Sequence, residues 1–169
     1  ELAAVIVRQM KILSVLSRDG SARHDATFDV QHSGEQFINV RLPDKGQLLT
    51  ALAAAQPVKP VRGPDGTISI PLPPGSANQA SVPVRLLYET TGPAWSSRGQ
   101  RPLDPPTLAS DIPILATDWQ VYAPDGFGFA KVDTQLVQEG TGVTAAFLES
   151  VNRSVTKDED FLPGGAAPA

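Results

Sequence analysis

The chain of 169 residues has no cysteine and only two histidines, His24 and His32. Without cysteine there can be no disulfide bond, no thiolate metal ligand and no cysteine nucleophile. The two histidines share one face of a predicted strand, but eight residues of strand would hold them about 26 Å apart. They cannot bind one ion together. We therefore predict no metal site and no cofactor, and we expect both histidines to be exposed to solvent.

The sequence also lacks long apolar runs, an excess of basic charge and known catalytic motifs. No stretch approaches the roughly 20 apolar residues of a membrane span, and the net charge of −4 disfavours nucleic acid as a partner. There is no Gly-x-Ser-x-Gly elbow and no phosphate-binding glycine loop. The chain is thus predicted not to be an enzyme. Because it begins at Glu1 rather than Met, we expect that a leader or flanking region has been removed and that any membrane anchor lies outside this fragment.

What the sequence does contain is turn-forming residues, with 16 prolines and 14 glycines. These residues divide the chain into short segments and favour strands over long helices. Apolar or alternating patterns predict strands within residues 3–17, 21–34, 35–43 and 81–91. Arg18-Asp19-Gly20 is a predicted hairpin turn between the first two strands.

The triplet Pro-Asp-Gly occurs twice, within residues 63–67 and 123–127. Proline, aspartate and glycine in this order are typical of a hairpin loop. Strand-like segments flank both copies. We interpret both copies as turns between strands rather than as a repeated chemical site.

Several further segments complete the expected architecture. Residues 46–56 could be strand or helix, and we favour strand. Residues 92–113 form a long irregular connection, residues 143–151 have helical spacing, and residues 157–169 resemble a tail or linker. The prediction is an all-β, mostly antiparallel β-sandwich over residues 1–156, with one short C-terminal helix, followed by the tail.

Aromatic residues are the remaining candidates for a binding site. Trp119 and Tyr122 have opposite parity in one predicted strand, so we expect Trp119 to face the core and Tyr122 to face outward. Trp95 lies in the long connection and is either a ligand contact or a cover folded over the sheet. Trp95 and Tyr122 are therefore the candidate ligand-binding residues, and a carbohydrate ring is the candidate ligand.

The order of these segments resembles a β-sandwich region of large uncharacterised extracytoplasmic proteins of bacteria. The matching residues are Gln-Phe-Ile at 36–38, Leu-Pro at 42–43, Leu-Leu-Tyr at 86–88 and the segment 119–124, within a match over about residues 8–126. The resemblance implies a module of a larger exported or membrane-tethered protein, and it brings no catalytic residue. The chain departs from the pattern at residues 53–56, where a glycine-containing turn is expected.

We therefore expect a non-catalytic structural or protein-interaction module, located outside the cytoplasm in the periplasm or at the cell surface. Its partners would be other domains of the same protein or another protein, bound through an exposed sheet edge or the 92–113 connection. The alternatives are a carbohydrate-binding module and, third, a hydrolase domain. A calcium site assembled from aspartates of separate loops also stays open, since sequence alone does not reveal such sites.

Overall fold

The computed structural model describes residues 4–109, 112–129 and 131–136. The chain divides into two compact units, Glu1–Pro124 and Asp125–Ala169. The second unit contains no helix or strand within its described residues, 125–129 and 131–136. The helix expected at 143–151, the domain end expected at 156 and the tail expected at 157–169 lie outside the described residues.

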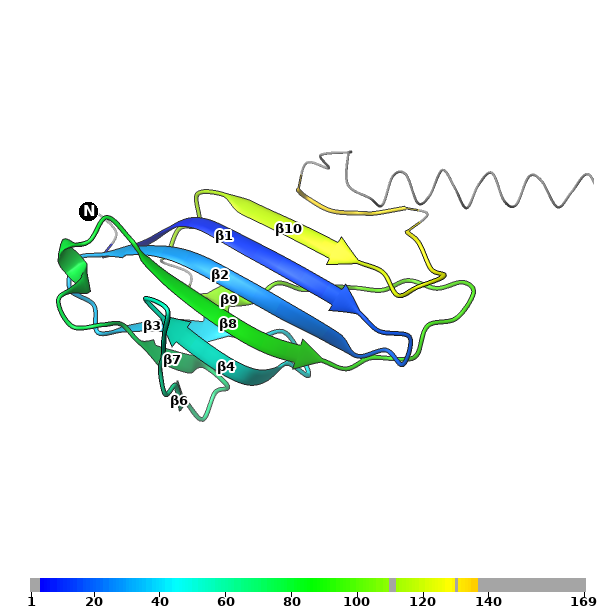
Figure 1. Cartoon of the computed structure of the whole chain (residues 1–169), viewed down its shortest axis with the longest axis horizontal. Coiled ribbons are helices and arrows are strands. Elements are labelled where there is room, and N and C mark those ends of the chain that lie inside the picture. The colour runs from blue at the N-terminus through cyan, green and yellow to red at the C-terminus, as the bar shows by residue number, and fades with distance from the viewer. Residues whose placement is uncertain (1–3, 110–111, 130, 137–169) are drawn as a thin grey trace, which may run out of the picture. The chain divides into compact units, whose positions relative to one another are not determined.

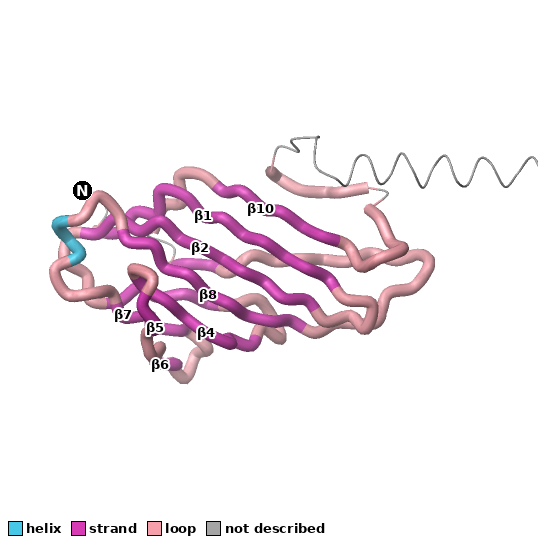
Figure 2. Tube along the Cα trace, in the orientation of Figure 1, coloured by secondary structure: helices cyan, strands magenta, loops and turns pink. Residues whose placement is uncertain are grey.

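The regular elements of the first unit are strands and one turn of 3₁₀ helix, as Figures 1 and 2 show. The elements in chain order are β1 (Val5–Leu16), β2 (Ala22–His32), β3 (Phe37–Arg41), β4 (Gln47–Ala53), β5 (Gln56–Pro57), β6 (Val61–Arg62), β7 (Ile68–Pro71), η1 (Ser76–Asn78), β8 (Val82–Thr90), β9 (Thr107–Leu108) and β10 (Thr117–Tyr122). Among the described residues, no helix has the length and apolar character needed to cross a membrane.

The strands form two sheets. The six-stranded sheet has the order β10-β1-β2-β8-β4-β5, and the four-stranded sheet has the order β6-β7-β3-β9. In Figure 1 the strands β3, β7 and β9 lie behind the large sheet. All strand pairs are antiparallel except β1 with β10, which is parallel. The predicted all-β, mostly antiparallel sandwich is therefore confirmed.

The core lies between the sheets, and the alternating strand residues supply it. In β8, Val82, Val84, Leu86 and Tyr88 are all buried, while the intervening residues point outward. Strand β2 follows the same pattern with Ala22, Ala26, Phe28 and Val30. Ile38 and Val40 of β3 and Ile68 and Ile70 of β7 close the core from the small sheet. A period of two along each strand thus places the apolar side chains between the two layers.

Both Pro-Asp-Gly triplets are turns, as predicted. The first joins β6 to β7 in an antiparallel hairpin, and Gly66 has a φ of 82° that favours glycine. Gly126 of the second triplet has a φ of 81°. The strand expected after the second triplet is wrong for the described residues, because 127–129 and 131–136 contain no strand.

Within residues 46–56, strand β4 covers Gln47–Ala53, as favoured, and it ends in an unusual turn. Ala53 pairs with Gln56, so Ala54 and Ala55 are the two central residues of a tight hairpin. Their φ angles are 48° and 62°, which is the left-handed region that type I′ turns require. The glycine-containing turn expected here is thus a turn built from alanines.

The connection after β8 is long and mostly irregular, as predicted, and it is fixed against the β1–β2 turn. The Trp95 amide donates to the Arg18 carbonyl at 3.0 Å, and the Arg101 guanidinium donates to the carbonyl oxygens of Gly20 and Pro93. Gly20 has a φ of 93°, and a Cβ on it would lie 2.2 Å from the Gly92 carbonyl oxygen. Only glycine permits this close approach.

Candidate functional site

A row of polar side chains crosses the inner face of the large sheet. Ser14 of β1 pairs with His24 of β2, and His24 pairs with Tyr88 of β8. Ser14 and Tyr88 are fully buried, and His24 is 3% exposed. The Trp119 indole of β10 donates from Nε1 to Ser14 Oγ at 2.8 Å. Four adjacent strands therefore contribute to one buried polar row.

The expectation that both histidines are exposed is wrong, because His24 is 3% and His32 is 7% exposed. The reason is visible in the alternation along β2. Both histidines have the parity of the apolar residues Phe28 and Val30, which face the core. A histidine on the apolar face of a half-buried strand is buried with its neighbours.

Both ring nitrogens of His24 have hydroxyl partners. Nδ1 lies 2.7 Å from Ser14 Oγ, and Nε2 lies 2.9 Å from Thr90 Oγ1. Because a hydroxyl can donate or accept, this pair of partners satisfies either neutral tautomer. The ring also stacks on Tyr88, with 4.6 Å between centroids and 16° between planes. The histidine is thus held on both edges and on one face.

Burial sets the protonation of this row. Burial lowers the pKa of His24 from 6.5 to about 4, because the charged imidazolium is poorly solvated inside the sandwich. For the same reason burial raises the pKa of Tyr88 far above its ordinary value of 10.0. Both side chains are therefore neutral at neutral pH.

A serine hydroxyl beside a histidine nitrogen is also the arrangement of a nucleophile and its base. Here Ser14 is fully buried and His24 is nearly so, so a substrate could not reach the hydroxyl without opening the sheet. The contacts instead join β10, β1, β2 and β8. We interpret the row as a structural tie across the sheet.

His32 makes a second tie at the other end of β2. The Ser76 hydroxyl donates to the Pro73 carbonyl at 2.6 Å, so it accepts a hydrogen bond from His32 Nε2 at 2.8 Å. The Gly34 amide donates to Nδ1 of the same ring at 3.3 Å. His32 is therefore protonated on Nε2, and it fixes the η1 turn against the end of β2.

The outer face of the large sheet carries an open depression of about 370 Å³. Its lining side chains come from β10, β1, β2 and β8 and are mostly polar: Lys11, Ile12, Leu13, Asp25, Thr27, Arg85, Asp118 and Gln120. Within it the Arg85 guanidinium donates from Nε and Nη2 to the two Asp25 carboxylate oxygens at 2.9 and 2.5 Å. This bidentate pair crosses from β8 to β2 and fixes the floor of the depression.

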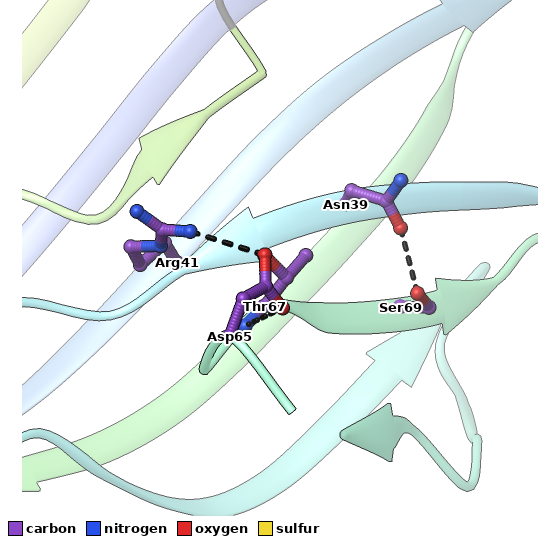
Figure 3. Close-up of polar contacts among 5 residues, drawn as sticks. All are labelled: Asn39, Arg41, Asp65, Thr67 and Ser69. Atoms are coloured by element: carbon purple, nitrogen blue, oxygen red, sulfur yellow. Dashed lines mark hydrogen bonds and ion pairs between the residues drawn. The ribbon is translucent and has the colours of Figure 1, made fainter. Parts of the chain in front are cut away.

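The aspartate of the first Pro-Asp-Gly triplet acts within its own turn (Figure 3). Asp65 accepts hydrogen bonds from the Thr67 amide at 3.1 Å and from the Thr67 hydroxyl at 2.7 Å. Arg41 of β3 adds an ion pair at 3.2 Å, and the Thr67 hydrogen bonds and this charge hold the Asp65 pKa below its usual value. The carboxylate is therefore engaged as a turn-stabilising group.

The two predicted ligand-binding aromatics lie on different elements. Tyr122 ends β10 and is 49% exposed, as its parity predicts. Trp119 packs against the core, also as predicted. Trp95 is half-buried in the connection that follows β8. Among described residues no group of three His, Asp or Glu side chains is placed to hold a metal ion.

Sequence reasoning missed the polar row. Ser14, Thr90 and the burial of His24 were not anticipated, although parity carried the signal. Ser14 and His24 each share the parity of the buried apolar residues on their own strand. A polar residue on an apolar face needs a buried partner, so the two could have been paired before the structure was known.

The edges of the two sheets differ in length. The outermost strands are β10 and β5 in the large sheet and β6 and β9 in the small sheet. Strands β5, β6 and β9 have two residues each, whereas β10 has six. Within the described part of the chain, β10 is thus the long unpaired edge.

Neither a protein-family model nor a curated protein matches the chain. Similar solved structures include an M1 zinc metallopeptidase from Deinococcus radiodurans, with 21% identity over 52% of this chain and 20% of that one, at a TM-score of 0.42. Yeast LTA4 hydrolase is 10% identical over 52% of this chain and 15% of that one, at a TM-score of 0.41. Legionella pneumophila aminopeptidase A is 10% identical over 52% of this chain and 11% of that one, at a TM-score of 0.42. The chain spans about a fifth or less of the length of those proteins.

Proposed function

We propose that the chain is a non-catalytic protein-interaction module of a larger exported or membrane-anchored bacterial protein, and that the free edge of β10 is its contact surface. The observation that carries the proposal is the difference between the sheet edges. Very short strands and proline are common protections against edge-to-edge pairing. Strands β5, β6 and β9 have the first protection and β5 also has Pro57, whereas β10 has neither.

The backbone of β10 has hydrogen-bonding groups available on its outer side. The Ala116 carbonyl accepts from the Met10 amide of β1 at 2.9 Å. Successive residues of a strand direct their amide and carbonyl groups to opposite sides. The groups of Thr117, Trp119 and Val121 therefore point away from β1, where a partner strand can bind them.

Apolar side chains flank this edge. Leu115, just before β10, is 67% exposed, and Tyr122 at its end is 49% exposed. Leu13 and Val15 of the neighbouring β1 are exposed on the outer face. Backbone groups with nearby apolar side chains supply both the affinity and the selectivity of strand addition.

Photo-crosslinking in the source cells tests the proposal. A photoreactive p-benzoylphenylalanine replaces Tyr122 in the full-length protein, and a matched copy carries it in place of Val61, which is 61% exposed on the two-residue edge strand β6. We expect a discrete protein adduct from position 122 and none from position 61. Thr117→Pro should abolish the adduct because it removes an outward amide without touching the β1 ladder, while Thr117→Val should keep it. Equal adducts at both positions, or adducts indifferent to Thr117→Pro, would refute the proposal.

Carbohydrate binding is the second candidate, favoured by the depression on the outer face. Tyr122 points outward from β10 like Gln120, and Asp25, Arg85 and Gln120 of the depression could hydrogen-bond to sugar hydroxyl groups. Calorimetric titration with a panel of soluble glycans tests it, with Tyr122→Ala and Trp95→Phe as variants. A glycan that binds wild type and is lost in Tyr122→Ala would support this candidate. Binding unchanged in Tyr122→Ala, or no binding by wild type, would exclude a site at this tyrosine.

A further inference from the structure

We propose that the partner of the β10 edge is a second copy of this chain, paired antiparallel about a two-fold axis centred on Trp119. The inference rests on the proposed function, since it names the occupant of the same edge. It would join two six-stranded sheets into one continuous sheet.

The burial pattern of β10 determines which residue types a strand added at its edge needs. The inward residues of the added strand would lie beside Thr117, Trp119 and Val121 of β10, which are partly buried. The added inward residues should therefore extend the core. The outward residues of the added strand would lie beside Asp118 and Gln120, which are exposed. An incoming strand therefore needs alternating inward-apolar and outward-polar residues, without a second acid opposite Asp118.

Strand β10 itself meets this description. Its inward residues are Thr117, Trp119 and Val121, and its outward residues include Asp118 and Gln120. The Trp119 indole donates a hydrogen bond to Ser14 of its own chain. The ring is therefore directed toward β1 and away from the free edge, where the second copy would pair. The β10 strand of a second copy thus has the residue pattern that the free edge requires.

The available backbone groups then select the register. A two-fold axis at Asp118 would place the two Asp118 carboxylates directly opposite each other, which is destabilising. An axis at Trp119 pairs Thr117 with Val121, Trp119 with Trp119, and Val121 with Thr117 through outward-pointing backbone groups. An axis at Gln120 leaves Thr117 without a partner residue in β10. The axis at Trp119 therefore makes the most backbone hydrogen bonds and sets Asp118 opposite Gln120.

Because the chain contains no cysteine, single cysteines can report this register without background. The full chain is prepared as Asp118→Cys and as Gln120→Cys. In the proposed register, position 118 of one copy lies opposite position 120 of the other, about 4.5 Å apart between Cα atoms. Each position lies about 8 Å from its own counterpart, beyond disulfide reach.

The decisive experiment oxidises each variant alone and then the two mixed, and measures covalent dimer on a non-reducing gel. We expect the mixture to form on the order of tenfold more dimer than either variant alone, and Thr117→Pro in both variants to abolish it. Light scattering of the wild type over a concentration series should show dimer. Dimer from Asp118→Cys or Gln120→Cys alone, equal to that of the mixture, would overturn the register. A strictly monomeric wild type would overturn the second copy as partner.

These outcomes are distinct from failure of the proposed function. If the crosslinked adduct from position 122 depends on Thr117 but has a mass other than two copies of the chain, the edge binds a different protein. The inference about a second copy then fails while the proposed function stands. If no adduct depends on Thr117, both fail together.

Discussion

The hydroxyl group of Tyr88 is buried and has no hydrogen-bond partner among the described residues. An unpaired buried hydroxyl costs about 1–3 kcal/mol. We therefore expect Tyr88→Phe to leave the free energy of unfolding unchanged or to raise it by about 1 kcal/mol, since the ring and its stack on His24 remain. Urea unfolding measures this, with His24→Ala as the contrasting variant that loses both hydrogen bonds and the stack. A loss of more than about 1 kcal/mol in Tyr88→Phe would reveal an undetected partner.

The two alanines of the β4–β5 turn have a strained backbone conformation. Ala54 and Ala55 have φ angles of 48° and 62°, and the left-handed conformation costs about 1–2 kcal/mol per non-glycine residue. Asn-Gly is the preferred pair for this turn. We expect the double change Ala54→Asn with Ala55→Gly to raise the melting temperature by several degrees, about 1 kcal/mol or more. The control is Ala53→Gly in the adjoining strand, which should lower it. An unchanged melting temperature in the double variant would mean that the turn is not strained.

For single residues, the sequence indicates which side chains are buried better than it indicates their hydrogen-bond partners. Parity along β2 and β8 separates buried from exposed positions, since side-chain direction depends only on local backbone geometry. The same parity places His24 and His32 on the buried face of β2, where the expectation of exposed histidines fails. The hydrogen bond between His24 and Thr90 joins residues 66 positions apart in the sequence, so no local pattern could supply it.

Strand β10 shows what element-scale reasoning could and could not reach. Its alternation predicted a strand with Trp119 inward and Tyr122 outward, and both are confirmed. Its parallel pairing with β1 was not predicted. A long connection separates β8 from β10, so the direction of return depends on tertiary contacts rather than on turn chemistry. The free edge, and with it the proposed contact surface, follows from this placement.

The indole hydrogen bond to Ser14 should hold β10 on the sheet. Trp119→Phe removes the donor while keeping an aromatic ring against the core, and we expect the amide groups of residues 118, 120 and 122 to exchange about tenfold faster. Hydrogen-exchange mass spectrometry measures the β10 peptide against a β3 peptide. Tyr122→Phe is the matched aromatic control and should change neither. An equal acceleration in both peptides would show global destabilisation and no specific role at β10.

For the whole molecule, the number and order of turn signals indicated a sandwich, and the two sheets confirm it. The assignment of strands to sheets could not be read from sequence, because residues 37–41 and 47–53 look alike locally but enter different layers. Long-range packing decides this point. Edge protection likewise becomes visible only when the strand order is known.

The buried His24 should make the stability of the whole sandwich depend on pH. Its pKa is about 4 in the folded chain, against an ordinary value of 6.5. The unfolded chain therefore binds more protons between these values, and stability falls as pH drops from about 6.5 to 4. The His24 contribution is fully present above 6.5, and the loss amounts to about 3 kcal/mol by pH 4.

Urea unfolding between pH 7.5 and 4.5 measures this loss in wild type and in His24→Gln, which keeps hydrogen-bonding groups but does not titrate. Hydrogen bonds from Ser21 and Thr67 lower the pKa of Asp19 and Asp65 below 3.8. These carboxylates lose their contribution mainly below the measured range and equally in both proteins. We expect the wild-type curve to fall more steeply by about 2–3 kcal/mol over the range. Parallel curves would mean that His24 can be protonated without opening the sheet, and the buried row would then not limit stability in acid.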